Sequence, residues 1–311
     1  MAGWALALPG LAFDLQGHRG ARGLAPENTL AAFRTALSIG VTTLETDLAV
    51  TRDGVLVISH DPFLNPDLAR GDDGRWLAEK GPPIRTLALA ELARYDVGRA
   101  DPASRYARQF PEQRAADGER VPTLGEVFAL GRASPKPVRF NIETKITPAA
   151  PDDSVDPAAF ARLVVDATRS AGLADRVTIQ SFDWRTLLEA KKLAPEIETV
   201  CLTIETADND TVRRNAGGPS PWLGGLDLAA VGGSLPKLVK AAGCGTWSPF
   251  WRNVTASLVV EAHALGLKLI PWTVNEPANM AALIAIDVDG LITDYPNRLR
   301  KVMADNGIPL P

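Results

Sequence analysis

Short apolar runs alternate with segments of helical spacing in the N-terminal part of the chain. Residues 28–39 carry apolar side chains three or four positions apart and are followed by Gly40, which predicts a helix with a glycine C-cap. Residues 13–17 and 43–50 are short and apolar and predict strands on either side of this helix. A third run, 55–59, follows a tight turn and predicts the second strand of a hairpin.

The same alternation resumes after a long interruption and continues toward the C-terminal end. The predicted helices span residues 123–131, 157–171, 184–193, 235–242, 256–265 and 277–285. The predicted strands span residues 138–145, 177–182, 198–204, 246–248, 268–274 and 290–293. With 55–59 set aside as an appendage, eight core strands remain. Repeated strand–helix units of this kind predict a parallel sheet closed into a (β/α)8 TIM barrel of the α/β class.

Residues 62–121 interrupt the alternation and are rich in Pro, Gly, Asp and Arg. So long a segment without periodic structure is unusual inside a compact barrel. We therefore expect one domain over residues 13–311, with an insertion after the second strand. Because the insertion directly follows His60 and Asp61, we expect it to act as a lid over the site to which those residues belong.

Residues 1–12 are apolar and contain no lysine or arginine. The segment is too short to span a bilayer. It resembles the apolar region of a signal peptide, with Gly10-Leu11-Ala12 as the cleavage site, but the basic leader of such a peptide is missing. Two interpretations stay open. A truncated signal segment would make the protein periplasmic or secreted, and an N-terminal extension packed under the barrel would fit a cytoplasmic protein.

Composition restricts the class of partner. The 311 residues are 46% hydrophobic, enough for a sizeable core, and carry a net charge of −4. A negatively charged chain without a basic stripe is not expected to bind nucleic acid, and no stable membrane insertion is expected. Cys201 and Cys244 cannot form a disulfide framework, so we expect buried thiols and keep a single bridge as the alternative. The sequence leaves the oligomeric state open.

Two of the three histidines lie in charged clusters that follow predicted strands. His18 precedes Arg19 in a glycine-flanked loop, and His60 precedes Asp61. Histidine has the side chain that titrates nearest to neutral pH, so both are candidate proton carriers. His263 lies in a predicted helix without a charged neighbour, and we expect it at the surface or in packing.

Three carboxylates mark the ends of two predicted strands. Glu45 and Asp47 are two positions apart and therefore point to the same face of their strand, and Glu143 lies near the end of another. In a barrel, the carboxyl ends of the strands gather at one mouth. Oxygen ligands suit Mg²⁺ or Ca²⁺ and do not suit Zn²⁺, so we expect a divalent cation of the first kind. A metal, two histidines, an arginine and a lysine together indicate chemistry on a phosphate ester.

Five segments carry a resemblance to a known family. They read HRGARGLAPENTLAAF at 18–33, LETDLAVTRDGVLVISHD at 44–61, NIETK at 141–145, PWTVN at 271–275 and DGLITDYP at 289–296. Together and in this order they resemble the bacterial glycerophosphodiester phosphodiesterase family. The resemblance implies a (β/α)8 barrel with an insertion after the second strand. It also implies metal ligands at Glu45, Asp47 and Glu143 and an acid–base pair at His18 and His60.

Three further residues are expected to contact the substrate. Arg19 would hold the phosphate through two parallel hydrogen bonds, and Lys145 would add positive charge beside the oxyanion that develops in the reaction. A salt bridge to a carboxylate of the metal site is the alternative for either residue. Trp272, at a strand end, lines the pocket or packs the barrel rim. Asn28 would cap the following helix, and Glu27 would orient Arg19.

These expectations combine into a metal-dependent enzyme that hydrolyses glycerophosphodiesters to sn-glycerol 3-phosphate and an alcohol, with a role in glycerol and lipid metabolism. The insertion would contact the alcohol moiety of this small-molecule substrate through Trp76 and Tyr106. Two alternatives stay open: a lysophospholipase D-type phosphodiesterase on the same fold, and a barrel that binds phosphodiesters without catalysis. The sequence does not decide which histidine is the base, which metal binds, or which head group is preferred.

Overall fold

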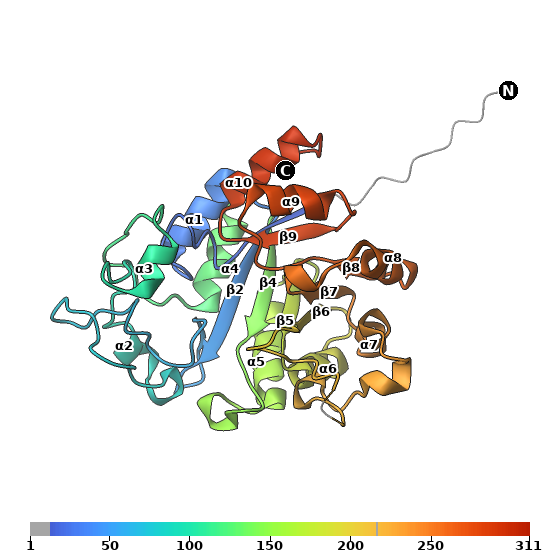
Figure 1. Ribbon diagram of the computed structural model, residues 1–311. Helices are drawn as coiled ribbons and strands as arrows, with labels where there is room; N and C mark the ends of the chain where they lie inside the picture. Colours follow the sequence, from blue (N-terminus) through green and yellow to red (C-terminus); the bar gives the residue numbers. More distant parts are fainter. Residues whose placement is uncertain (1–12, 216) are drawn as a thin grey trace.

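Eight parallel strands form the centre of the computed structural model, which describes residues 13–215 and 217–311 (Figure 1). They are β1 (Asp14–Gly17), β2 (Thr43–Val50), β4 (Arg139–Thr144), β5 (Val177–Ser181), β6 (Glu198–Thr203), β7 (Thr246–Pro249), β8 (Lys268–Leu269) and β9 (Gly290–Thr293). Their order in the sheet is β8-β7-β6-β5-β4-β2-β1-β9. The predicted (β/α)8 TIM barrel is confirmed.

The ring closes between β8 and β9 through the residues that follow β8. The amide of Val274 donates to the Ile292 carbonyl over 3.0 Å, and the amide of Ile292 donates to the Pro271 carbonyl over 3.0 Å. The strand expected over 268–274 is regular only over Lys268–Leu269. Pro271 has no N–H to donate to a ladder, which accounts for the early end of the regular strand.

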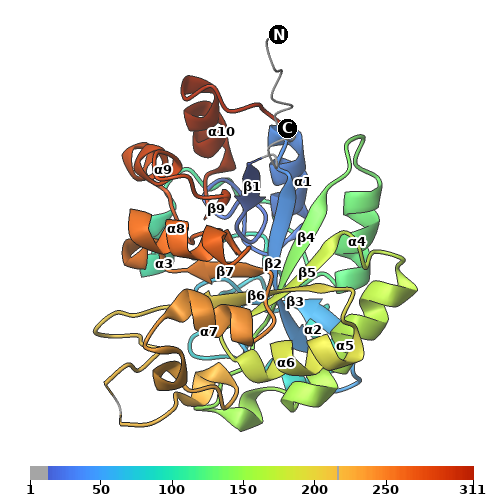
Figure 2. The same ribbon diagram turned by 90° about the vertical axis from the view of Figure 1, so that its right-hand side faces the viewer.

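A helix follows each barrel strand, and the helices surround the strands in Figures 1 and 2. They are α1 (Leu30–Ile39), α4 (Leu124–Arg132), α5 (Pro157–Ser170), α6 (Trp184–Leu193), α7 (Leu235–Ala241), α8 (Ala256–Ala264), α9 (Pro277–Ile284) and α10 (Pro296–Asp305). Gly40 caps α1 in the left-handed conformation, as predicted. The sequence analysis did not predict α10, although Leu299, Val302 and Met303 are buried at helical spacing in this otherwise polar segment.

The main apolar core lies between the strands and the helices. Phe33 of α1, Phe140 of β4 and Trp184 of α6 are fully buried there. Phe140 packs edge-on against Phe128 of α4, with ring centroids 5.0 Å apart. This packing holds the strands rigidly, so that side chains at their carboxyl ends keep fixed positions.

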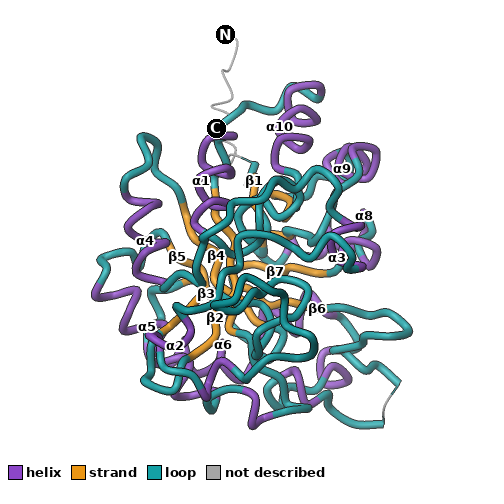
Figure 3. Tube along the Cα trace, turned by 90° about the vertical axis from the view of Figure 1, so that its left-hand side faces the viewer, coloured by secondary structure: helices purple, strands orange, loops and turns teal. Residues whose placement is uncertain are grey.

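β3 (Leu56–Ile58) pairs antiparallel with β2 and stands outside the ring, as expected for the second strand of a hairpin. The chain then enters the insertion, which contains a 3₁₀ turn, η1 (Ile84–Thr86), and two short helices, α2 (Leu89–Leu92) and α3 (Arg105–Gln109). It forms a lobe beside the barrel in Figure 1, and Figure 3 shows that most of this lobe is loop. Other 3₁₀ turns are η2 (Pro151–Asp153), η3 (Pro221–Leu223), η4 (Leu228–Val231) and η5 (Trp251–Asn253).

A small apolar cluster of its own stabilises the insertion. The cluster joins buried residues of the insertion to the hairpin and comprises Ala49, Val57, Leu64, Ala69, Ile84, Leu92 and Val121. Trp76 lies at the edge of the lobe, where its Nε1 donates to the Arg99 carbonyl over 3.4 Å and Arg70 stacks over its ring at 5.7 Å. The insertion is therefore folded and anchored to the hairpin that carries two of the candidate metal ligands.

The two cysteines form a disulfide, so the expectation of two free thiols is wrong. Cys201 of β6 and Cys244, just before β7, are bonded with their Cα atoms 6.0 Å apart. They are 43 positions apart in the sequence, but β6 and β7 are parallel neighbours in the barrel, which brings the two side chains together. Both cysteines are buried in the main core.

His263 has a charged partner, contrary to the expectation from its sequence neighbours. Its Nε2 lies 3.0 Å from the Asp289 carboxylate, which also accepts the Leu269 amide over 2.7 Å. This pair ties α8 to the start of β9 and stands apart from the candidate site. Among the described residues no helix is long and apolar enough to cross a membrane. Residues 1–12, on which the signal-segment prediction rests, lie outside the described residues.

Candidate active site

The three predicted metal ligands meet at the carboxyl ends of two neighbouring strands. In the parallel register of β2 and β4, Asp47 lies opposite Glu143 and Glu45 opposite Asn141. One carboxylate oxygen from each of Glu45, Asp47 and Glu143 lies within 4.8 Å of the other two. The three residues are only 2%, 1% and 7% exposed. Three buried carboxylates this close together repel one another strongly unless positive charge lies between them.

Each of these carboxylates is held by hydrogen bonds from outside the triad. Glu45 accepts the backbone N–H of Arg19 over 2.8 Å on one oxygen and the side-chain amide of Gln180 over 2.7 Å on the other. Asp47 accepts the side-chain amide of Asn28 over 2.9 Å. These partners take some of the lone pairs and leave others free to bind a cation among the three carboxylates, as the supporting residues of a metal site do.

The clustering and burial of the three carboxylates favour a cation among them. Burial raises the pKa of Glu45 well above its ordinary value, and the nearby Asp47 raises it further. Burial likewise raises the pKa of Glu143 to about 7, against the lowering effect of Lys145. Burial also disfavours the charged form of Asp47, but the charge of Arg19 outweighs this and keeps its pKa well below the ordinary range. Oxygen Oδ1 of Asp47 is buried and has no hydrogen-bond partner among the residues that the structure describes.

Charge balance around the cavity supports one divalent ion. Five largely buried carboxylates and three largely buried cations lie there, namely Glu27, Glu45, Asp47, Glu143 and Asp294, and Arg19, Arg22 and Lys145. With both imidazoles neutral, the group lacks two positive charges, which is the charge of Mg²⁺ or Ca²⁺. The all-oxygen donor set fits the same two ions.

His18 is backed by an aspartate from the other end of the chain. Its Nδ1 lies 2.6 Å from Oδ1 of Asp294, 276 positions away, while its Nε2 lies 3.9 Å from Glu45. The carboxylate can only accept a hydrogen bond, so it favours the tautomer with the proton on Nδ1. Burial lowers the pKa of His18 to about 4, and the charge of Arg22 adds to this, against the opposing effect of Asp294.

His60 has the same arrangement in a more exposed position. Its Nδ1 lies 3.0 Å from the carboxylate of Asp61, which in turn accepts the Asn65 side-chain amide over 2.7 Å. Its side chain is 34% exposed, against 11% for His18. Burial lowers the pKa of His60, and the charge of Arg19 adds to this. Both histidines lie on the same cavity, each with one ring nitrogen engaged by a carboxylate.

The loop that carries His18 and Arg19 is shaped by two glycines. A Cβ on Gly17 would lie 2.2 Å from the Gly20 carbonyl oxygen, and one on Gly20 would lie 2.7 Å from the backbone of α1. Between them Arg19 adopts a left-handed conformation, with φ 49°. Only a loop without these side chains can fold so tightly, and this fold directs the Arg19 N–H to Glu45.

The guanidinium of Arg19 is already engaged by carboxylates. Nη1 donates to Glu27 over 2.8 Å, and Nε lies 3.2 Å from Asp47. Glu27 therefore orients Arg19, as expected. A phosphate held by two parallel hydrogen bonds would require Arg19 to give up one of these contacts, so the structure shows the salt-bridge alternative, and phosphate binding stays a prediction.

Lys145 also shows the salt-bridge alternative. Its Nζ donates to Glu143 over 2.8 Å and lies 3.8 Å from the partnerless oxygen of Asp47. The ammonium thus lies beside the three carboxylates, where it offsets part of their charge. It lines the cavity as well, so it can contact a phosphate bound there.

An aromatic wall bounds one side of the cavity, which has a volume of about 150 Å³. Trp272 lines it together with Phe182, whose ring centroid lies 5.2 Å away, and the Trp272 Nε1 donates to the Ser248 carbonyl over 3.0 Å. Phe250 packs behind Trp272 at 5.6 Å. Trp272 therefore lines the pocket and packs the rim at once.

Three residues of the site, Arg22, Gln180 and Asp294, were given no role from the sequence, although Gln180 and Asp294 were expected at the carboxyl ends of their strands. Arg22 lines the cavity and forms two hydrogen bonds with Asp294, of 2.8 and 3.0 Å. Gln180 lines the cavity beside Glu45. For Asp294 and Gln180, position at the end of a barrel strand was the available indication. Arg22 carried none, because its role depends on a partner far away in the sequence.

Asn28 does not cap α1, contrary to expectation. The N-cap is Thr29, whose hydroxyl accepts the Ala32 amide over 3.2 Å. Asn28 has a left-handed backbone, with φ 57°, and bridges β2 by donating to Asp47 and accepting the Thr46 hydroxyl over 3.1 Å. Its side-chain amide therefore holds Asp47 in position and fixes the loop to β2.

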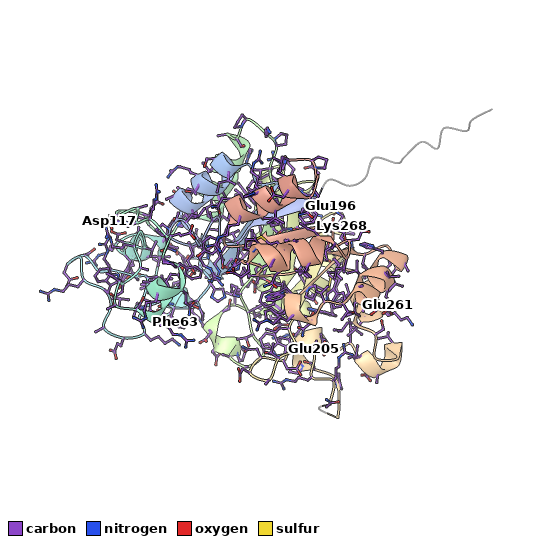
Figure 4. The ribbon with its side chains drawn as sticks, turned by 45° about the horizontal axis from the view of Figure 1, so that its top comes forward. Phe63, Asp117, Glu196, Glu205, Glu261 and Lys268 are labelled. Carbon is purple, nitrogen blue, oxygen red and sulfur yellow. A yellow bond between two sulfur atoms is a disulfide. The ribbon has the colours of Figure 1, made fainter. Side chains whose placement is uncertain are left out.

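The described residues of the insertion contact residues that support the site, but they do not line the cavity that contains His18 and His60. Tyr106 of α3 donates its hydroxyl to Glu27 over 2.5 Å, so it touches the residue that orients Arg19 and not the cavity itself. Trp76 lies farther out against Arg70. A smaller recess of about 50 Å³ lies on the insertion side of His60 and is lined partly by Phe63, which is labelled in Figure 4.

A barrel whose strand ends bring together clustered carboxylates, two histidines and buried cationic side chains is typical of a phosphoric ester hydrolase. The chain belongs to the glycerophosphoryl diester phosphodiesterase family, whose model matches residues 18–298, and it is a phosphoric diester hydrolase. A glycerophosphodiester phosphodiesterase from Caldanaerobacter subterraneus subsp. tengcongensis is 30% identical over 93% of this chain and 97% of its own length. Another from Bacillus subtilis is 29% identical over 92% of this chain and 84% of its own length.

Solved structures are similar over nearly the whole chain. A candidate glycerophosphoryl diester phosphodiesterase from Silicibacter pomeroyi DSS-3 has a TM-score of 0.85 and 34% identity, over 98% of this chain and 97% of its own. A phosphodiesterase from Oleispira antarctica, solved with its product sn-glycerol-3-phosphate, has a TM-score of 0.68 at 22% identity, over 93% of this chain and 96% of its own. The second similarity is one of fold.

Proposed function

We propose that this enzyme hydrolyses glycerophosphodiesters to sn-glycerol 3-phosphate and an alcohol, with bound Mg²⁺ or Ca²⁺ and with His18 and His60 as proton carriers. The observation that carries the proposal is that two aspartate-backed imidazoles line one cavity together with Glu45 and Glu143, and that Asp47 lies within 4.8 Å of these two carboxylates. The names of the relatives and the product bound to the Oleispira antarctica protein are in keeping with this substrate class.

The two histidines divide the proton transfers between them. Asp294 and Asp61 engage Nδ1 of His18 and His60, so that each Nε2 is the nitrogen available to the substrate. One imidazole accepts the proton of the attacking group, which is water or the adjacent glycerol hydroxyl, the latter giving a cyclic phosphodiester that water then opens. The other imidazole protonates the leaving alkoxide.

The cations of the site hold the phosphate between the histidines. Arg19 and Lys145 line the cavity and lie within reach of the carboxylate triad. A divalent ion held by Glu45, Asp47 and Glu143 supplies Lewis-acid charge to the phosphoryl oxygens when it is bound. In binding, the substrate phosphate would compete with Glu27 and Asp47 for the guanidinium of Arg19.

Cavity size favours a glycerophosphodiester over a lysophospholipid. Pockets that enclose ligands of drug size have volumes of about 300–1,000 Å³, and the cavity here is about 150 Å³ and lined largely by polar residues. A glycerol phosphate fits this space, whereas a long acyl chain would have to lie outside it. The intact pair of backed histidines counts against a barrel that only binds phosphodiesters.

A substrate panel tests the proposal. Glycerophosphocholine, glycerophosphoethanolamine and lysophosphatidylcholine are each supplied to enzyme reconstituted with Mg²⁺ or Ca²⁺, and release of the free alcohol, choline or ethanolamine, is measured. The other product is sn-glycerol 3-phosphate from the first two substrates and lysophosphatidic acid from the third. We expect turnover of the first two with a catalytic efficiency well above that for the lysophospholipid. Preferred turnover of lysophosphatidylcholine would favour the lysophospholipase D alternative, and no turnover of any of the three would contradict the proposal.

We also propose that the protein works in the periplasm or outside the cell. The disulfide between Cys201 and Cys244 supports this, because such bonds persist mainly in oxidising compartments. The test is to block free thiols in intact cells and then to measure which fraction of the protein carries the bridge, and in which compartment. Reduced protein confined to the cytoplasm would contradict the proposal.

A further inference from the structure

A chain of hydrogen-bonded amides crosses the interior of the barrel and ends on a metal ligand. Gln180 of β5 donates its side-chain N–H to Oε1 of Glu45 over 2.7 Å. The Gln180 carbonyl oxygen accepts from Asn141 of β4 over 2.9 Å. Gln180 and Asn141 are each 1% exposed, so neither amide exchanges these partners freely for water.

The series of hydrogen-bonded side chains continues from Asn141 to the opposite end of the barrel. Asn141 also donates to the carbonyl oxygen of Gln16 on β1 over 2.9 Å, and Gln16 donates to Asp14 over 3.0 Å. Asp14 is itself held by Arg139 at 2.8 Å and by the Thr43 hydroxyl at 2.7 Å. The far end of the chain is therefore a fixed, charged anchor.

This anchor lies beside a cavity at the amino ends of the strands. The cavity has a volume of about 300 Å³ and is lined by Gln16 and Asn141 of the chain. Glu196 and Lys268, labelled in Figure 4, also line it. Its charged groups bond to one another, as Lys268 does at 3.8 Å to Glu198 and Asp14 to Arg139, so we assign it no ligand.

The two carboxylate ends determine how every amide in the chain is turned. A carboxylate only accepts hydrogen bonds, so Gln180 must present N–H to Glu45, and Gln16 must present N–H to Asp14. Both then present oxygen to Asn141, whose two N–H protons satisfy them, while its own oxygen accepts the Thr178 hydroxyl over 2.8 Å. Rotating the Asn141 amide by half a turn would direct its oxygen at Gln16 and Gln180. Both would then have to present N–H to Asn141 and oxygen to their carboxylates.

Hydrogen-bonded amides are a less favourable filling for a barrel interior than apolar side chains, so their presence here indicates that the orientation they impose has a role. The interior of these barrels is ordinarily filled by bulky branched apolar side chains, and each buried amide loses solvation that only good hydrogen bonds repay. Here Gln16, Asn141 and Gln180 occupy the space below the metal ligands, and the bonds they form are directional. Apolar residues would fill the same volume without directing anything at Glu45.

We propose that Gln180, itself held in orientation by Asn141, is a positioning residue that fixes the Glu45 carboxylate for the metal. The Gln180 N–H occupies a lone pair on Oε1, and the Arg19 N–H occupies one on Oε2. Glu45 is thus clamped from both sides in the orientation that turns its remaining lone pairs toward Asp47 and Glu143. The inference rests on the proposed divalent-cation site, because it concerns how one ligand of that site is held.

The first test replaces Gln180 by a residue of similar length without an amide. In Gln180→Met we expect the dissociation constant for Mg²⁺ or Mn²⁺, measured by calorimetry without substrate, to rise roughly 10–100-fold, as for other residues that support metal ligands. Saturating metal should restore most of kcat. Ser181→Ala is the matched control, because Ser181 lies on the same strand, is fully buried and donates to the Thr144 carbonyl, away from the triad. We expect its metal affinity to equal that of the wild type.

A second variant tests the orientation argument without touching Glu45 or Gln180. Asn141→Asp keeps the shape but replaces the two N–H donors by an acceptor, so Gln180 would have to turn its N–H toward residue 141 and its oxygen toward Glu45. We expect weaker metal binding, together with a lower melting temperature of the metal-free protein because the new carboxylate is buried. Affinity is therefore compared at a temperature at which both proteins are folded. Thr178→Val removes only the hydroxyl that donates to Asn141, and we expect it to bind metal nearly as the wild type does.

The outcomes separate this inference from the function on which it rests. If the wild type binds no divalent ion, the proposed metal-dependent function fails. If the wild type binds metal and Gln180→Met and Asn141→Asp bind it equally well, the function stands and the inference is overturned. If Gln180→Met does not fold, Asn141→Asp alone decides. If Gln180→Met lowers kcat and saturating metal does not restore it, Gln180 contributes to general packing, and the positioning role is equally overturned.

Discussion

At the scale of single residues, each histidine of the site is paired with an aspartate that engages its Nδ1. The two pairs differ in depth, because Asp294 is fully buried whereas Asp61 is partly exposed. Asp294 also binds Arg22 and accepts the Asn275 side-chain amide over 2.7 Å. One carboxylate thus orients a histidine, an arginine and the loop after β8 together.

Replacing either histidine tests its role as a proton carrier. We expect His18→Ala and His60→Ala each to lower kcat by roughly 10²–10⁴-fold, the usual contribution of a positioned acid or base. Because the two act in one reaction, the double variant should lose much less than the product of the single losses. Steady-state kinetics on glycerophosphocholine provides the measurement. Wild-type turnover in His60→Ala would remove His60 from the mechanism.

Asp294 should also make the stability of the fold depend on pH. Burial opposes its charged form, but the charge of Arg22, followed by that of His18, outweighs this and holds the pKa of Asp294 well below the ordinary 3.8. A group whose pKa is lower in the folded state stabilises the fold above its unfolded pKa and loses that contribution as the pH falls toward the folded value. The stabilisation relative to Asp294→Asn should therefore be largest above pH 4 and shrink below it, by up to about 1.4 kcal/mol per pH unit.

Urea unfolding of both proteins in chelator, from pH 6 down to pH 3, measures that difference. A difference in the free energy of unfolding that stays constant throughout this range would show that Asp294 titrates normally. Such a result would mean that the ion pair with Arg22 contributes nothing to the fold.

Much of the site could be predicted from the sequence at this scale. Glu45, Asp47 and Glu143 were identified because alternating positions on a strand share a face and parallel strands end together. The partners of these residues were not accessible in the same way. Asp294 lies 276 positions from His18, and which strand end meets which loop depends on how the ring closes.

At the scale of elements, the insertion supports the loop that carries Arg19 and Arg22. Tyr106 donates to Glu27, which accepts from Arg19, and Phe110, whose ring lies 5.0 Å from that of Tyr106, packs under Arg22 at 4.7 Å. An insertion over residues 62–121 was expected from the sequence, but which of its aromatic residues point inward could not be predicted. Apolar periodicity carries that information for helices and strands, and this segment consists mostly of loop.

Removing one hydroxyl tests this support. We expect Tyr106→Phe to raise KM for glycerophosphocholine by about 2–10-fold, the effect of one hydrogen bond, because Glu27 loses a donor and holds Arg19 less firmly. Metal affinity should not change. Tyr95→Phe is the control, since Tyr95 packs against the small apolar cluster of the insertion. Kinetics and calorimetry on both variants suffice. If Trp76→Ala shifts selectivity between head groups while Tyr106→Phe has no effect, the insertion is a specificity lid as the sequence analysis predicted.

At the scale of the whole molecule, the disulfide joins two neighbouring strands across a 43-residue separation that includes α7. We expect Cys201→Ala combined with Cys244→Ala to lower the free energy of unfolding by about 2–4 kcal/mol, with KM unchanged because the bridge lies in the core away from the cavity. Chemical denaturation and kinetics measure the two effects. Equal stability with and without the bridge would show that the barrel does not depend on it.

The order of strands and helices could be predicted from the sequence, but the contacts that form when the ring closes could not. Alternating strand and helix patterns predicted the eight-stranded ring, and the helical spacing of α1 and its glycine cap were placed correctly. The disulfide was expected only as the alternative to two free thiols, and the pairing of His263 with Asp289 was not predicted, because each joins residues that only the closed ring brings together.

A titration of metal-free enzyme with Mg²⁺ or Ca²⁺ tests the account most directly, with binding measured by calorimetry and hydrolysis of glycerophosphocholine measured on the same samples. We predict no activity after exhaustive chelation, one ion bound per chain, and activity that rises in proportion to occupancy, with Zn²⁺ a poorer substitute. Glu143→Gln should fold, bind metal far more weakly and stay inactive at concentrations that saturate the wild type. Full activity in chelated enzyme with no metal bound would contradict the account.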